Sequence, residues 1–152
     1  MRRFFEQHVL GATRLEPEEH HLHVAAAALM LEVSRSDYHV GDTERRAVAR
    51  ALELALEVPP ERTAQIVGLA EQQVRLGTRV HEFARLIDER YSKVHKRRLV
   101  ELLWRVAFSD AELKTQEEYL VRKIAELIHV PFDDFLEAKI TARERFFERG
   151  GR

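Results

Sequence analysis

Two short segments of the chain each carry an aspartate followed by a glutamate at the same spacing. The first pair is Asp37 and Glu44, and the second is Asp110 and Glu117. Carboxylate oxygens are the ligands that hard divalent cations such as Ca²⁺ and Mg²⁺ prefer in proteins. The four carboxylates therefore form a candidate divalent-cation site, and no other cofactor and no catalytic residue is predicted.

The two aspartates and the two glutamates differ in their expected places on helices. Asp37 and Asp110 fall at predicted helix C-termini, where a negative charge opposes the helix dipole at a cost of about 0.3–1 kcal/mol. Glu44 and Glu117 fall in predicted first turns, where the same dipole favours them. Helix stability thus explains the glutamates but not the aspartates, so Asp37 and Asp110 are the stronger functional candidates.

The spacing does not match an EF-hand, whose loop needs a glutamate at its twelfth position. Val48 and Val121 stand at those positions here. The structural alternative is that each aspartate caps the loop backbone or pairs with a neighbouring arginine. On the spacing alone this alternative is favoured, because surface carboxylates are common. The arginines considered for Asp37 are Arg35, Arg45 and Arg46.

The two Asp–Glu segments belong to a longer internal similarity. Leu29–Leu54 aligns without gaps over Leu102–Leu127, and the identical polar positions carry more weight than the apolar ones, which any two amphipathic helices share. We interpret the match as a duplicated helix–loop–helix unit. The identical pairs are Leu29/Leu102, Val33/Val106, Ser36/Ser109, Asp37/Asp110, Glu44/Glu117, Val48/Val121, Glu53/Glu126 and Leu54/Leu127.

Histidines offer a second kind of metal chemistry. Residues 18–21 and 126–129 both read Glu-x-x-His, a motif that ligates iron in ferritin-like bundles. One copy lies at a predicted helix start and the other at a helix end, whereas di-iron ligands lie inside long helices. His20, His21 and His23 would need further ligands to bind zinc. We therefore interpret these residues as surface groups and keep a metal-dependent enzyme as the less favoured alternative.

Helical periodicity runs through nearly the whole chain and no segment alternates like a strand. Pro59-Pro60, Gly77 and the capping box Thr115–Glu118 separate the periodic segments. The pattern predicts an all-α fold, a compact bundle of about seven to eight helices. The predicted helices cover about residues 2–9, 17–36, 42–57, 60–76, 78–90, 92–108, 115–129 and 131 onward.

Length and composition set further limits. The 152 residues suit one domain, with a core at about 17–140 and a peripheral N-terminal helix and C-terminal tail. A net charge of −1 argues against a nucleic-acid binder. The absence of cysteine excludes thiolate chemistry. The longest apolar run, Val24–Leu31, is too short for a transmembrane segment, and the charged N-terminus is unlike a signal peptide, so we expect a cytoplasmic protein.

Three stretches of the sequence form a recognisable pattern: His21–Val33 with Ser36-Asp37, Lys96–Leu113 with Glu117–Leu120, and Ile128–Pro131 with Phe135. Together they resemble the TerB-like family, in particular its uncharacterised bacterial branch. The resemblance covers about residues 17–140 and implies a duplicated all-helical bundle. It also implies metal-chelating acidic positions, which fall here on Asp37, Glu44, Asp110 and Glu117. The family often has glycine after the aspartate, whereas Tyr38 and Ala111 stand here.

The family name, which refers to tellurite resistance, does not imply tellurite reduction by this chain, because that chemistry normally uses thiols or a redox cofactor. We expect a non-enzymatic module that binds a divalent cation and acts as an interaction or scaffold component in a stress or tellurite-resistance-type response. The expected partner is a protein, with a homodimer as one possibility. The alternative is a purely structural interaction domain without metal.

Overall fold

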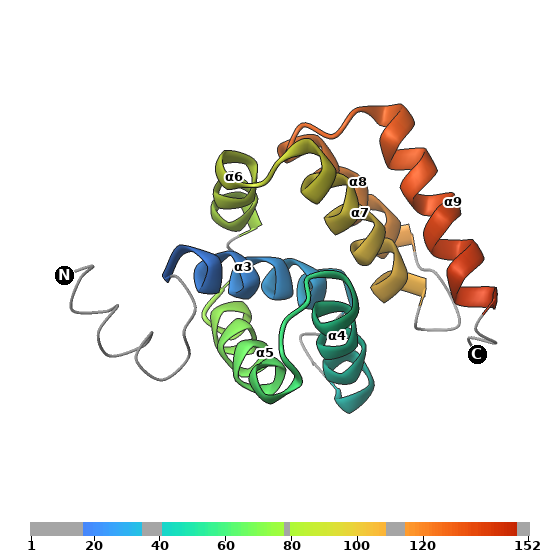
Figure 1. The fold of residues 1–152 in the computed structure, drawn as a ribbon. Coiled ribbons are helices and arrows are strands. Elements are labelled where there is room, and N and C mark those ends of the chain that lie inside the picture. Colours follow the sequence, from blue (N-terminus) through green and yellow to red (C-terminus); the bar gives the residue numbers. More distant parts are fainter. Residues whose placement is uncertain (1–16, 35–40, 78–79, 109–114, 149–152) are drawn as a thin grey trace.

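The computed structural model describes residues 17–34, 41–77, 80–108 and 115–148. These residues form seven α-helices and no strand, so the predicted all-α fold is confirmed (Figure 1). The helices are α3 (Pro17–Ser34), α4 (Asp42–Ala55), α5 (Pro60–Arg75), α6 (Val80–Arg90), α7 (Lys93–Phe108), α8 (Thr115–Leu127) and α9 (Phe132–Glu148).

Helix α3 lies at the centre of the bundle and packs against α4, α5, α6, α7 and α8. Figure 1 shows α4 and α5 on one side of α3, with α6 and α7 on the other. Every residue from Ala25 to Leu31 is at most 1% exposed. A helix that is apolar on all sides can be stable only when neighbours cover it all round, which is the position that α3 occupies.

Helix α9 covers the outer side of α7. Phe135, Ala138 and Ala142 on α9 are buried, and the Phe135 ring lies 5.3 Å from the ring of Trp104 on α7. Trp104 also stacks on Phe108 at 5.7 Å and is fully buried. The α7–α9 contact is thus built largely around Trp104.

The observed helices begin and end close to the predicted positions. Pro60 lies in the first turn of α5. Gly77, just beyond α5, has a φ of +132°, which residues other than glycine rarely adopt. Helix α8 ends in a Schellman motif, in which His129 N–H donates to Glu126 O and Val130 N–H to Ala125 O. The predicted helix at 2–9 lies outside the described residues.

The duplicated unit corresponds to α3 with α4 and to α7 with α8. Among the matched positions that the structure describes, the pairs Leu29/Leu102, Val33/Val106 and Val48/Val121 are buried in both copies. Such burial is common to amphipathic helices in general, so the duplication itself stays a prediction.

Candidate functional site

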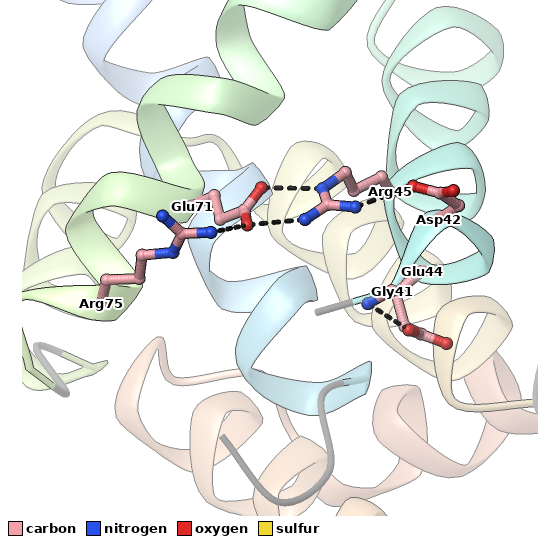
Figure 2. Close-up of polar contacts among 6 residues, drawn as sticks. All are labelled: Gly41, Asp42, Glu44, Arg45, Glu71 and Arg75. Atoms are coloured by element: carbon pink, nitrogen blue, oxygen red, sulfur yellow. Dashed lines mark hydrogen bonds and ion pairs between the residues drawn. The ribbon is translucent and has the colours of Figure 1, made fainter. Parts of the chain in front are cut away.

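Glu44 lies in the first turn of α4 and accepts a hydrogen bond from the backbone of Gly41. The distance from Gly41 N to Glu44 Oε1 is 2.6 Å (Figure 2). Gly41 has the extended backbone of an N-cap residue but no side chain, so Glu44 supplies the glutamate half of a capping box. The second carboxylate oxygen, Oε2, takes no part in this bond. The predicted first-turn position is therefore confirmed, with one oxygen engaged by the helix start.

Glu117 occupies the equivalent first turn of α8 and is far more buried. It is only 6% exposed and interacts with a neighbouring group. A carboxylate in such a place needs compensating contacts, because removing a charge from water is costly. Glu44 and Glu117 thus differ in solvent access, although the sequence gives them the same spacing from an aspartate.

The two aspartates of the candidate site, Asp37 and Asp110, lie outside the described residues. Among the described residues, Arg45, one of the arginines considered as a partner of Asp37, forms ion pairs with Asp42 and Glu71. Which of the four predicted ligands come together therefore stays a prediction.

A charged network that the sequence pattern did not reveal joins α4 to α5 (Figure 2). Arg45 donates from Nε to Glu71 Oε1 and from Nη2 to Glu71 Oε2, both at 2.8 Å. Arg75 donates to the same Oε2 at 2.9 Å, and Arg45 Nη1 reaches Asp42 Oδ1 at 2.8 Å. The contacts within each helix join residues three or four positions apart, which are neighbours on a helix surface. The contact between helices had no sequence signal, because residues 26 positions apart meet only in the folded chain.

The network fixes the charge of Glu71, which is 9% exposed. Hydrogen bonds from Arg45 lower the pKa of the Glu71 carboxyl below its ordinary value, with Arg75 adding to the effect. The same contact raises the pKa of the Arg45 guanidinium. Because the pair holds the first turn of α4 against α5, it also positions the turn that carries Glu44.

The histidine cluster at the start of α3 is divided between core and surface. His20 and His23 are 7% and 8% exposed, whereas His21 is exposed. Burial lowers the pKa of both His20 and His23, and the Nδ1 atom of each has no hydrogen-bond partner among the residues that the structure describes. The interpretation of all three histidines as surface groups is wrong for His20 and His23, because the face of α3 that carries these two residues is turned toward the bundle.

Neither histidine motif forms a metal centre within the part of the chain that the structure describes, where no three histidine, aspartate or glutamate side chains gather around one point. Glu126 and His129 have 70% and 75% exposed side chains at the end of α8. His129 Nδ1 lies 3.0 Å from Asp88 Oδ1 on α6. The surface interpretation of the second Glu-x-x-His motif is confirmed.

A pocket of about 440 Å³ lies where the start of α3, the end of α4 and the α6–α7 junction meet. Charges of both signs line it, and burial together with the charge of Glu19 raises the pKa of Tyr91 to about 12, so this phenol stays protonated. The pocket can therefore offer neutral and charged hydrogen-bonding groups to a small polar molecule. It is lined by Glu19, Leu22, His23, Ala55, Leu56, Glu57, Arg90, Tyr91, His95 and Arg98.

The basic run between Lys93 and Arg98 is largely engaged within the protein. Lys96 Nζ lies 2.6 Å from Asp88 Oδ1, Arg97 pairs with Glu137, and Arg98 Nη1 donates to Ala55 O at 3.1 Å. These side chains connect α7 to α6, α9 and the end of α4. They have structural partners, so the run needs no nucleic-acid ligand to account for it.

None of the helices within the described residues is long and apolar enough to cross a membrane. The fold and the candidate site together define an all-helical domain with a first-turn glutamate at each of two loop–helix junctions.

The family model for the tellurite resistance protein TerB matches residues 23–140. The chain belongs to this family, and the resemblance of its motifs is confirmed. No curated protein and no solved structure gives a match to the chain.

Proposed function

We propose that this TerB-family domain binds a divalent cation through Asp37, Glu44, Asp110 and Glu117. The observation that carries the proposal is the position of Glu44, whose carboxylate is held by Gly41 N–H at the junction with the segment containing Asp37. Glu117 has the corresponding place in α8, next to the segment containing Asp110. An oxygen-only ligand set suits Ca²⁺ or Mg²⁺ better than zinc or copper.

The two proposed ligands that the structure describes, Glu44 and Glu117, are chemically suited to bind a divalent cation. Glu44 is half-buried, and its Oε2 atom lies outside the capping bond. A carboxylate with one oxygen fixed by the backbone has fewer orientations to lose when the other oxygen binds an ion. Glu117 is more deeply buried and would have to exchange part of its present interaction for the ion.

The role that we propose for the bound ion is structural rather than catalytic. An ion shared by the loop carboxylates would order the segments that precede α4 and α8, and so shape a surface for a protein partner in the cytoplasm. Membership of the TerB family supports a place in a tellurite-resistance-type stress response. A purely structural interaction domain without metal is the competing proposal, because the bond from Gly41 N–H also gives Glu44 a role that needs no ion.

Calorimetric titration of the full chain with Ca²⁺, Mg²⁺, Mn²⁺, Zn²⁺ and Fe²⁺ separates these proposals. We expect Ca²⁺ or Mg²⁺ to bind to the unmodified chain and binding to be lost in Asp37→Asn/Asp110→Asn. The matched control is Glu61→Gln/Asp133→Asn, which removes two exposed first-turn charges elsewhere and should leave binding unchanged. The absence of binding to the unmodified chain would rule out the metal site. Zinc or iron binding that survives the double substitution would move the site to the histidines.

A further inference from the structure

Helix α9 has two apolar faces. One face packs on α7 through Phe135, Ala138 and Ala142. The other carries Phe132, Leu136 and Ile140, which are 55%, 40% and 57% exposed. Residues at i, i+4 and i+8 lie in line along a helix, so these three side chains form one continuous ridge. We call this ridge the α9 stripe.

Helix α8 borders the α9 stripe at Phe132. The guanidinium of Arg122 lies over the Phe132 ring at 5.6 Å, and Tyr119, one turn before Arg122, is 65% exposed. Single exposed apolar residues are normal on a soluble protein, but a contiguous group of large ones marks an interaction surface. Phe132 also stacks on the buried Phe135 at 5.9 Å, but the packing of α9 on α7 uses the opposite face and does not account for the exposed Leu136 and Ile140.

The charges along α9 show what kind of partner fits the stripe. Asp133 and Glu137 come before Ala138, and Lys139 and Arg143 come after it at matching distances. Consider a second α9 laid antiparallel along the α9 stripe, with the centre of the contact level with Ala138 along the helix axis. This arrangement sets the acidic positions of each helix against the basic positions of the other. It would also set Leu136 against Ile140 of the second copy and oppose the two helix dipoles.

Asp133 and Arg143 are the charges available for such a contact. Both are exposed, and neither forms an ion pair with another side chain in the described ranges. Glu137 and Lys139 already have partners, Arg97 and Glu118. In a twofold arrangement every contact occurs twice, so two Asp133–Arg143 pairs would flank the apolar centre.

We propose that the α9 stripe is the contact between two copies of this chain, related by a twofold axis and with their α9 helices antiparallel. The proposal is independent of the divalent-cation site. A contact centred on three side chains and Tyr119 is smaller than the roughly 1,600 Å² of a standard interface, so the dimer is a weak and reversible one.

Sedimentation velocity of the full chain in EDTA and low salt, from about 5 to about 500 µM, tests this inference. We expect a concentration-dependent monomer–dimer equilibrium that Ile140→Glu abolishes. The matched control is Leu76→Glu, which changes an exposed leucine beyond α5 and should leave the equilibrium unchanged. Far-UV circular dichroism of each variant checks that the bundle is folded. A chain that stays monomeric throughout, or a dimer that survives Ile140→Glu, overturns the proposal.

Charge variants test the antiparallel arrangement. Asp133→Arg and Arg143→Asp alone should each weaken the dimer by about tenfold, because each creates two like-charge pairs. The double variant Asp133→Arg/Arg143→Asp restores opposite charges across the interface and should recover dimerisation. Single variants that dimerise as well as the unmodified chain would overturn the arrangement, as would a double variant weaker than either.

Discussion

The guanidinium of Arg45 on α4 and the carboxylate of Glu71 on α5 form a bidentate pair, with both N–O distances at 2.8 Å. Two parallel bonds of this kind fix orientation as well as distance. The pair connects the first turn of α4, which contains Glu44, to the middle of α5. It therefore positions Glu44, which is the member of the first Asp–Glu pair that the structure describes.

Replacing Arg45 by lysine keeps the charge but removes the two-pronged geometry. We expect Arg45→Lys to lower the melting temperature by about 2–4 °C, less at high salt, because the Arg45 side chain is partly exposed and its charge is screened. Differential scanning calorimetry at two salt concentrations measures both effects. Arg46→Lys changes an exposed neighbour and serves as the control. Equal melting temperatures for the two variants would show that the two-pronged geometry of the Arg45–Glu71 pair contributes no stability.

Trp104 should be the residue of the α7–α9 contact that is most sensitive to truncation. It is fully buried, with Phe108, Phe135 and the Lys139 ammonium against its ring. Trp104→Ala is expected to reduce the free energy of unfolding by about 3–5 kcal/mol. Trp104→Phe should cost clearly less, because it keeps most of the ring and removes an Nε1 that has no hydrogen-bond partner in the described part of the chain. Urea denaturation followed by circular dichroism measures both, and equal losses would contradict this account.

Stability should fall as the pH is lowered from about 6.5. The pKa values of His20 and His23 are lowered in the folded chain, chiefly by burial. As the pH falls, these histidines therefore take up protons in the unfolded chain before they do so in the folded chain. The stability that is present above the pKa of the unfolded chain is lost as the pH falls toward the pKa of the folded chain. Glu19 opposes the shift of His23, while His21 and Arg62 favour that of His20.

Melting temperatures at pH 7.5, 6.5 and 5.5 measure this dependence. His20→Gln/His23→Gln should reduce the slope strongly, whereas His21→Gln, at an exposed position, should reduce it much less, because it removes only one of the causes that lower the pKa of His20. A slope that is the same in all three proteins would place its origin outside the buried histidines. The lowered pKa of Glu71 acts in a separate, more acidic range, below the ordinary carboxyl pKa.

His129 occupies the left-handed position of the Schellman motif, with a φ of +63°. An L side chain in this conformation is strained by about 1–2 kcal/mol relative to glycine. His129→Ala and His129→Gly both remove the contact with Asp88, so their difference isolates the backbone effect. We expect the glycine variant to be more stable than the alanine variant by about 1 kcal/mol. Chemical denaturation provides the comparison, and an alanine variant of equal stability would contradict it.

The helices could be predicted because their signals are local. Pro60, Gly77 and the periodic apolar residues from Leu99 to Ala107 each act within a few residues, so they can be read without knowing the fold. The apolar run in α3 is recognisably too short to span a membrane, but its coverage on every side came from the structure. Of the candidate site, sequence spacing placed Glu44 and Glu117 correctly in first turns, and it proposed Asp37 and Asp110, which the described residues do not test.

The sequence by itself thus determined the helices, their ends and membership of the TerB family, because short-range hydrogen bonding and hydrophobic periodicity depend on neighbours along the chain. Only the tertiary structure decided which polar groups meet and which are buried. It paired Arg45 with Glu71, buried His20 and His23 while exposing His21, and left Leu136 and Ile140 at the surface of α9. These outcomes depend on how helices distant in sequence pack, and apolar periodicity does not specify that packing when a helix has two apolar faces.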